Sequence, residues 1–536
     1  MRSILFVLFF LICAHAQSNI YKITRKKDST QTTTLKIESH KSNYKPIHSQ
    51  KILRSLPYYV AEGSSGTSHI IYTEEITDTL SEQDIAFFQN SKKSNSFRYL
   101  NTTSTEVRTL VDQGPTQNRI NLTILGDGYT LSEKEKFFSD AERITKSLFS
   151  DETFTSYLPL FKVHAVFVAS KISGIGDGEP INTAFGLYRT PKGSKRSIFP
   201  SNERALEAAL RLAPKTDYPI VIANDDYYGG LGGRYAISTR SERSGMIVLR
   251  HELGHNFGDI GEEYDGGSVY SGANSSASAS ASKWQHWKTD NNVYTAKLLS
   301  SDYIWQNLSN KPYSIRFNTQ PNETMGIELS TVGWSSPSDV YVYLNGQKLE
   351  LPGDFHNDRN FYILDNVNVR AGQNTLDVKE NKSDNDNVLA TASIYSYPQN
   401  YNFTPDTTAS FATYDSSGRK SYRPTHNSCL MRNMMLKHFC SVDQENMWLK
   451  FLNRISLIDN LAVEADFIEV QTPELNFLKI FWFDENNKEI TFLRNNKKVY
   501  KKAIPQYKAL KVVVEFSTPE VKNYTSDFRV EKIIRL

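Results

Sequence analysis

The sequence has little excess of charge and no long apolar segment after its first residues. Its 536 residues include 62 Lys and Arg and 59 Asp and Glu, which gives a net charge of +3. A balance this close to zero gives no indication of nucleic-acid binding or of attraction to an anionic membrane. No later stretch approaches the roughly 18 apolar residues that a membrane-spanning helix requires. The sequence therefore predicts neither a nucleic-acid partner nor a membrane span.

Cysteine is also scarce, with three in the whole chain. The first, Cys13, lies in residues 1–16, where a basic residue, a short apolar core and an A-H-A cleavage pattern are typical of a secretory signal peptide. We therefore expect a secreted, extracellular protein. The other two, Cys429 and Cys440, would then form a disulfide, because an oxidising compartment favours pairing. Residues 17–110 contain no cysteine, which excludes a pro-segment that inhibits through a cysteine ligand.

Eight N-x-S/T sequons accompany the leader, and in a eukaryotic host most of them would carry glycans. They begin at Asn101, Asn121, Asn274, Asn307, Asn322, Asn381, Asn402 and Asn523. Asn121 falls in a predicted core strand, so we expect it to remain unmodified. Sequons also arise by chance, so they add little to the evidence for secretion.

The stretch with the clearest chemistry is GMIVLRHELGHNFGDIGEEYDGG, residues 245–267. Its apolar residues at positions 246, 249, 253 and 257 recur every three or four residues, which predicts a helix. On that helix His251 and His255 lie one turn apart on one face, where both imidazoles can bind one zinc ion. Glu252 would reach a water on the metal and act as general base. The alternative is an amphipathic helix whose histidines merely lie near the surface.

A catalytic zinc site needs three protein ligands and one open position. Gly258 and Gly261 end the predicted helix and turn the chain, and Glu262, Glu263 and Tyr264 follow at once. The acidic pair therefore lies where a third ligand is required.

The wider stretch HELGHNFGDIGEEY resembles the zinc motif of the bacterial IgA metalloendopeptidase (IgA peptidase) family and its eukaryotic relatives, which suggests a secreted member of eukaryotic type. Four further motifs are similar to parts of the same family: L-G-D-G-Y at 125–129, T-A-F-G at 183–186, Y-G-G-L-G-G at 228–233 and S-C-L-M-R at 428–432. The resemblance covers residues 120–265 and 420–450. It implies a metzincin-like zinc peptidase.

That resemblance implies a third ligand ten residues after the first His of the motif. Here the tenth position is Gly261, which has no side chain to coordinate a metal. Glu262 is the nearest acid, and a glycine before it lets the backbone turn its side chain towards the metal. We therefore predict Glu262 as the third ligand, with Glu263 as the fallback.

Four more residues are candidates for supporting the site. By the same resemblance, Met431 would lie beneath the zinc as an apolar floor, unless it is an ordinary core residue. Tyr264, His426 and Arg432 would support the ligands or the oxyanion, and for each the alternative is a purely structural role.

The order of elements in residues 119–265 predicts a mixed α/β sheet. The expected strands are 119–125, 161–170, 218–223 and an edge strand at 232–238, and the expected helices are one with a Ser132–Glu135 capping box, one at 202–212 and the zinc helix. By analogy with metzincins, the edge strand would pair with the substrate backbone. The glycines at 229–233 would give a bulky peptide room to approach, or they form an ordinary flexible turn.

The predicted fold class is an α/β (α+β) metzincin-like catalytic domain, interrupted by an all-β domain and followed by a β-sandwich-like domain. The layout is a signal peptide at 1–16, a partly disordered N-terminal region with a small β domain or pro-domain at 17–110, catalytic parts at 111–310 and 401–455, the insert at 311–400 and the C-terminal β domain at 456–536. Asn345-Gly346 marks a hairpin in the insert. The β domains would contact carbohydrate, or would only shape substrate access.

These features together predict a secreted zinc-dependent endopeptidase that acts on a protein or peptide substrate. One alternative is a secreted binding or adhesion protein with a vestigial peptidase domain, which the two β domains and many sequons would suit. Another is zinc-dependent hydrolysis of a non-peptide amide. The intact H-E-x-x-H pattern argues against a vestigial domain, because decay usually begins at the ligands or the base.

Overall fold

The computed structural model describes residues 104–536 except 151, 191–194 and 383–384, together with the backbone of four earlier strands. These strands form two antiparallel hairpins, β1 (Asn19–Lys27) with β2 (Thr33–Lys41) and β3 (Tyr58–Glu62) with β4 (Ser68–Tyr72). The predicted signal peptide at 1–16 lies outside the described residues. The chain divides into two compact units, Met1–Thr105 and Glu106–Leu536, and the zinc motif lies in the second.

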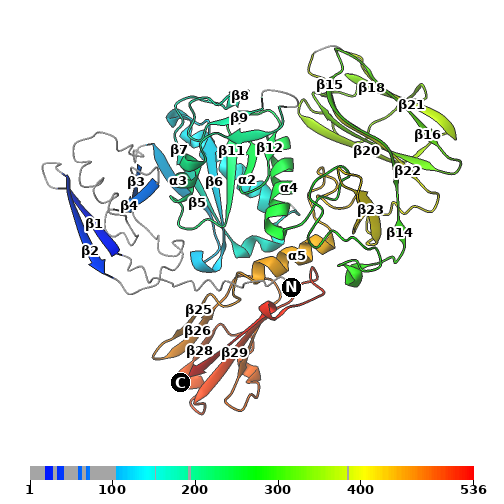
Figure 1. The fold of residues 1–536 in the computed structure, drawn as a ribbon. Helices are drawn as coiled ribbons and strands as arrows, with labels where there is room; N and C mark the ends of the chain where they lie inside the picture. The colour runs from blue at the N-terminus through cyan, green and yellow to red at the C-terminus, as the bar shows by residue number, and fades with distance from the viewer. Residues whose placement is uncertain are drawn as a thin grey trace, which may run out of the picture. The chain divides into compact units, whose positions relative to one another are not determined.

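A six-stranded sheet forms the centre of the second unit, in the order β12-β13-β11-β6-β7-β5 (Figure 1). The neighbours from β13 to β7 are parallel, and β12 runs antiparallel to β13. Every residue of β6 is buried, as expected for a central parallel strand. The bounds are β5 Thr105–Asp112, β6 Ile120–Asp127, β7 Phe161–Val168, β11 Tyr218–Ala223, β12 Gly230–Leu231 and β13 Ala236–Thr239.

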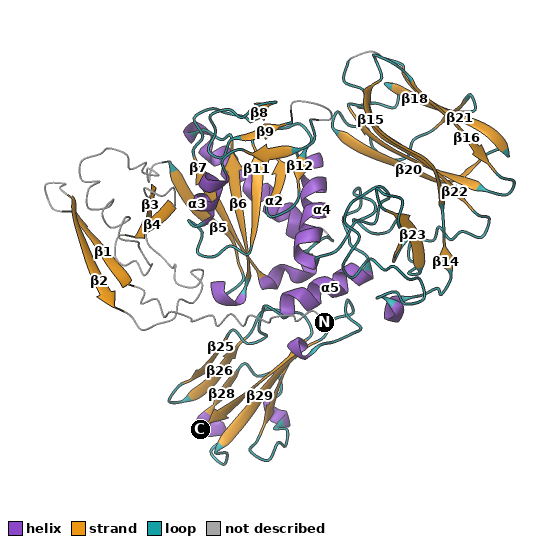
Figure 2. Ribbon diagram, in the orientation of Figure 1, coloured by secondary structure: helices purple, strands orange, loops and turns teal. Residues whose placement is uncertain are grey.

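Four helices accompany this sheet (Figure 2), namely α2 (Lys134–Ser150), α3 (Glu203–Leu210), α4 (Ser244–Gly258) and α5 (Ser441–Leu452). The helix α4 carries the zinc motif and packs between β13 and α5. Leu249 and Leu253 are fully buried, and the ring of Phe257 lies 5.5 Å from that of Phe451 on α5. Ile247 and Val248 are buried as well, so α4 is enclosed on more sides than the predicted stripe required.

Two local details of the predicted sheet and helices are wrong. The edge of the sheet is β12, whereas residues 236–239 of the predicted edge strand form β13 inside it. The capping box before α2 is formed by Thr130 and Glu133, because a 3₁₀ turn precedes the helix. Glu135 pairs with Arg108 instead.

Residues 297–397 form a two-sheet β structure with its own apolar core around Trp334. One sheet has the order β15-β22-β17-β20 and the other β16-β21-β18-β19. Asn345 and Gly346 connect β18 to β19 with φ values of 53° and 81°, as the predicted hairpin turn requires. The strands are β15 Lys297–Asn307, β16 Tyr313–Thr319, β17 Thr324–Val332, β18 Val340–Leu344, β19 Gln347–Leu349, β20 Arg359–Asn368, β21 Gly372–Glu380 and β22 Val388–Tyr397. The first strand thus precedes the predicted boundary at 311.

The C-terminal residues form two three-stranded sheets, β25-β26-β28 and β27-β29-β30. Their apolar side chains belong to the same core cluster as those of the central sheet, α4 and α5. The strands are β25 Asn460–Val463, β26 Phe467–Gln471, β27 Leu478–Phe483, β28 Lys498–Tyr500, β29 Ala509–Phe516 and β30 Arg529–Arg535.

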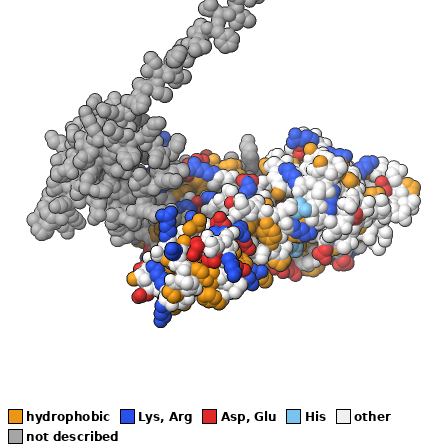
Figure 3. All heavy atoms as spheres, turned by 90° about the horizontal axis from the view of Figure 1, so that it is seen from below, with side chains coloured by type: hydrophobic (Ala, Val, Ile, Leu, Met, Phe, Trp, Pro, Cys, Tyr) orange, Lys and Arg blue, Asp and Glu red, His pale blue; other side chains and the backbone are white. Residues whose placement is uncertain are grey.

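Two smaller sheets complete the second unit. They are β8 (Gly176–Asp177) with β9 (Leu187–Arg189) and β10 (Ile198–Pro200), and β14 (Val293–Tyr294) with β23 (Ser410–Tyr414) and β24 (Lys420–Arg423). Positive and negative side chains are interspersed on the face seen in Figure 3, in keeping with the near-neutral composition. Among the described residues, no helix has the length and hydropathy to cross a membrane.

A buried ion pair links the central sheet to the C-terminal strands, and its loss should destabilise the fold. Arg119 donates to both carboxylate oxygens of Asp459, at 2.5 and 2.7 Å, and both side chains are less than a tenth exposed. Asp459→Ala leaves the guanidinium buried without its charge partner, which typically costs about 3–5 kcal/mol. We expect a clearly lower urea midpoint for this variant.

The matched control is Asp177→Ala, which removes the partner of Lys195 from a pair that is at least half exposed on both sides. Exposed pairs contribute little, so this variant should unfold almost like the parent protein. Equal urea midpoints for the Asp459 and Asp177 variants would contradict the larger contribution to stability that we expect from the buried pair.

Candidate metal centre

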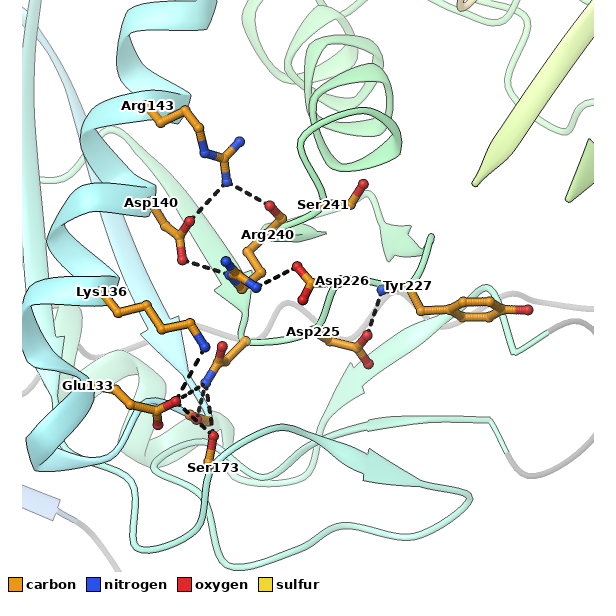
Figure 4. Close-up of polar contacts among 12 residues, drawn as sticks. Glu133, Lys136, Asp140, Arg143, Ser173, Asp225, Asp226, Tyr227, Arg240 and Ser241 are labelled. Carbon is orange, nitrogen blue, oxygen red and sulfur yellow. Dashed lines mark hydrogen bonds and ion pairs between the residues drawn. The ribbon is translucent and has the colours of Figure 1, made fainter. Parts of the chain in front are cut away.

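The residues just before α4 are fixed by a polar network with α2 (Figure 4). Arg240 donates to Asp140 at 2.9 Å, and Arg143 bridges Asp140 at 3.0 Å and the carbonyl of Arg240 at 2.6 Å. Next along the chain, Ser241 Oγ accepts the main-chain N–H of Ser244, which opens the helix. These contacts fix the start of α4 and hence the direction in which its histidines project.

The end of α4 places the acid next to the histidines. The helix ends at Gly258, and Asp259 takes the left-handed conformation with φ 49°, which reverses the chain. The carbonyl of Ile260 then lies 2.7 Å from His255 Nδ1 and can accept its proton. In the neutral imidazole this contact holds the proton on Nδ1, which leaves Nε2 as the atom that can coordinate a metal.

Three side chains meet at this point with the geometry of a metal centre. Nε2 of His251 lies 3.1 Å from one carboxylate oxygen of Glu262, and Nε2 of His255 lies 3.3 Å from the other. One donor atom from each of the three residues lies within 4.8 Å of the others. Glu262 Oε2 is buried and accepts no hydrogen bond of good geometry. A cation bound between the imidazoles would satisfy this oxygen, so the donor set fits a zinc ion.

The charges of the three groups reinforce one another. Burial lowers the pKa of His255, but the contact with Glu262 outweighs it and raises this pKa to about 9. Burial raises the pKa of Glu262, but the contacts with His251 and His255 hold it well below its usual range. Glu262 is therefore ionised at neutral pH, as a metal ligand must be.

Glu252 lies beside this group against the glycine-rich segment that follows β12. A Cβ on Gly232 would fall 1.8 Å from Glu252 Oε2, so the absence of a side chain at 232 makes room for the carboxylate. The glycine run, for which the sequence left substrate access and a flexible turn as alternatives, thus accommodates the predicted general base.

Residues 109–319 match the model of the family described as IgA Peptidase M64. This segment is similar to the IgA peptidase M64 family. It contains α4 and all three residues of the candidate metal centre, and it confirms the resemblance noted in the sequence. A comparison with curated proteins found no match.

Comparison with solved structures found weak likenesses outside the peptidases. One is the β-glucuronidase of an uncultured Clostridium species, with 11% identity, 42% of this chain and 34% of that chain covered, and a TM-score of 0.11. Another is the Ruminococcus gnavus β-glucuronidase, with 8% identity, 42% and 35% covered, and a TM-score of 0.11. The alignments span about a third of those chains.

Two of the predicted supporting residues lie at the candidate metal centre. Tyr264 has its ring 6.1 Å from that of His251, and burial, followed by the charge of Glu262, raises the pKa of its phenol well above the usual value. Met431 lies under the helix, since a Cβ on Gly254 would fall 2.8 Å from its Sδ. Its sulfur therefore packs against the turn of α4 between the two histidines.

His426 and Arg432 contact the inserted β structure. His426 is buried, with Nδ1 3.0 Å from the Tyr401 hydroxyl and Nε2 3.1 Å from Asp365. Arg432 forms an ion pair with Glu328. These contacts favour the structural alternative for both residues.

Glu263 and the two cysteines lie together behind the metal centre. The Glu263 side chain is fully buried and accepts a hydrogen bond from Asn274 at 3.1 Å, and burial raises its pKa to about 7. Cys429 and Cys440 are free thiols, so the predicted disulfide is wrong for this structure. Cys429 Sγ instead donates to Asp443 at 3.1 Å and accepts the main-chain N–H of Cys440.

Two asparagines that begin sequons are fully buried. Asn121 donates to the carbonyls of Thr116 and Arg119, as its predicted place in a core strand led us to expect. Asn274 donates to Gly261 O at 2.9 Å as well as to Glu263. A glycan on Asn274 Nδ2 would replace one of the two hydrogens that these bonds use, and the side chain is fully buried, so this sequon is unsuited to modification although the sequence did not indicate it.

Asp127 is a structural residue whose role the sequence analysis did not assign. It belongs to L-G-D-G-Y, and its carboxylate accepts hydrogen bonds from Thr183 Oγ1 at 2.8 Å and from the main-chain N–H groups of Phe185 and Leu187 at 2.8 and 2.7 Å. It thereby joins this motif to T-A-F-G. The signal available was an acid two residues after the predicted strand 119–125.

Proposed function

We propose that this chain is a secreted zinc-dependent endopeptidase. The observation that carries the proposal is the convergence of His251, His255 and Glu262, with Glu252 beside them. The M64 match makes a metallopeptidase the expected class. The leader sequence and sequons support secretion. The binding-protein alternative gains no support, because its premise was decay of the site, and the ligands and base are all present.

The donor set of two imidazoles and one carboxylate is typical of catalytic zinc with one open position. When bound, zinc lowers the pKa of a coordinated water towards about 7 and polarises the substrate carbonyl. Glu252 would take a proton from the attacking water and deliver it to the leaving amine. His255 is held in the ligating tautomer by Ile260 O. Tyr264, next to Glu262 and His251, would orient these ligands.

The test is hydrolysis of casein or of a peptide library by the purified protein, with and without a chelator. We expect hydrolysis that stops on chelation and returns when zinc is restored, together with zinc in elemental analysis of the active protein. Active protein without zinc, or hydrolysis that a chelator leaves unchanged, would rule the proposal out.

The contact between Glu252 and the glycine run gives a further prediction. In Gly232→Ala the new Cβ displaces the Glu252 carboxylate, and misplacement by about 1 Å can cost 10²-fold in rate. We therefore expect a fall in kcat of about 10- to 100-fold with unchanged zinc content.

The control is Gly233→Ala, whose Cβ would meet nothing within 4 Å although its φ of 118° is strained. It should lose stability but keep more of its turnover than Gly232→Ala. If both variants lose turnover equally, the fall in kcat comes from backbone strain and not from displacement of Glu252.

A further inference from the structure

A second group of metal-binding side chains lies behind the first. Glu263, Cys429, Cys440 and Asp443 each offer one donor atom, and these four atoms lie within 4.8 Å of one another. The residues come from the loop after α4, from the Met431 turn and from the start of α5. None is more than 6% exposed. Two thiols and two carboxylates therefore converge where water has no access.

The hydrogen bonds within this group leave two acceptors unused. Glu263 Oε1 accepts from Asn274, but Oε2 is buried without a partner. Asp443 Oδ2 accepts from the Cys429 thiol, but Oδ1 is likewise buried without a partner. A buried carboxylate oxygen without a donor is costly unless a cation or a proton satisfies it. Two such oxygens beside two thiols point to a cation as the missing partner.

The chemistry of the donors selects the cation. Thiolates favour zinc over magnesium and calcium, and four protein ligands with no open position are typical of structural zinc. Two thiolates and two carboxylates exceed the charge of one divalent ion. Arg423 and Arg432 act on Glu263 with positive charge, and Arg423 donates only to main-chain carbonyls in its hydrogen bonds. This charge compensates part of the excess.

We propose that Glu263, Cys429, Cys440 and Asp443 bind a second, structural zinc ion. Its neighbour in sequence, Glu262, faces the two histidines, so adjacent residues serve two separate centres. The main-chain N–H of Glu263 also donates to Met431 O at 3.2 Å. The second ion thus ties the loop that carries Glu262 to the turn beneath α4 and to α5.

The test is the zinc content of the purified full chain and of four variants. We expect about two zinc ions per chain in the parent protein and about one each in H251A/H255A and in C429S/C440S. D443N should also lose one ion, whereas E445Q, which changes another buried acid of α5, should keep both. A parent protein that contains one zinc, which C429S/C440S loses and H251A/H255A keeps, would contradict the proposed function and support the second zinc site.

Cobalt substitution distinguishes the two centres even where a cysteine variant fails to fold. Cobalt bound to thiolate gives a near-ultraviolet charge-transfer band, which we expect in the parent protein and in H251A/H255A. Peptide mapping without reduction is the second measurement on the parent protein. A Cys429–Cys440 disulfide in that map, or a single zinc that H251A/H255A loses with no thiolate band, would overturn the proposal.

Discussion

Glu252→Gln is expected to abolish nearly all peptide hydrolysis while the protein keeps its fold and its zinc. The Gln amide has the shape of the carboxylate and still fits beside Gly232, but it cannot accept the proton of the attacking water. General-base catalysis typically contributes about 10²- to 10⁴-fold in rate. Because Glu252 is not among the converging ligands, zinc content should not change. The loss should therefore appear in kcat.

The measurement is steady-state hydrolysis of one peptide substrate, with zinc analysis and circular dichroism on the same preparations. Glu242→Gln is the matched control, since this acid is exposed in the turn before α4 and should keep parental turnover. A Glu252→Gln variant that retains more than about a tenth of the parental rate would refute its role as general base.

The parts of the site that could be predicted from the sequence are those that depend on local spacing. His251 and His255 project together because a helix repeats every 3.6 residues, and the apolar periodicity around them already predicted that helix. The strand at 218–223 was predicted with its exact bounds for a similar reason, since it is a short apolar run. The prediction of the capping-box residues failed because Thr130–Glu133 and Ser132–Glu135 both satisfy the same sequence pattern. The path of the turn before α2 selects the first pair.

The parts of the site that could not be predicted depend on contacts between distant parts of the chain. Nothing near Arg432 or His426 in sequence indicates that Glu328 and Asp365 of the insert are their partners. The cysteines lie only 11 residues apart, but their environment includes Glu263, more than 160 residues earlier. The disulfide was predicted because these two cysteines are the ones that remain after the leader, and no local pattern indicates that acids surround the thiols.

Which of Glu262 and Glu263 is the third ligand also depends on contacts between distant parts of the chain. We expect the exchange of Glu262 to have a large effect on zinc affinity. Asp259 reverses the chain just before these two acids. Glu262 contacts both His251 and His255, whereas Glu263 faces Asn274 and Cys429. Partners that merely orient a ligand are worth about 10- to 100-fold in metal affinity, so Glu262→Gln should cost on the order of 100-fold or more.

The affinity of the histidine-containing centre can be measured as the free zinc concentration that restores half of the activity to chelator-treated protein. Glu262→Gln should need far more zinc than the parent protein, because a neutral amide replaces the only anionic ligand of that centre. Glu263→Gln changes the neighbouring acid by the same atoms. As a ligand of the proposed second centre it should lose that ion, but it should raise the zinc requirement of the histidine-containing centre far less than Glu262→Gln does. Restoration of Glu262→Gln at the parental zinc concentration, together with failure of Glu263→Gln, would reverse the assignment and place the third ligand on Glu263.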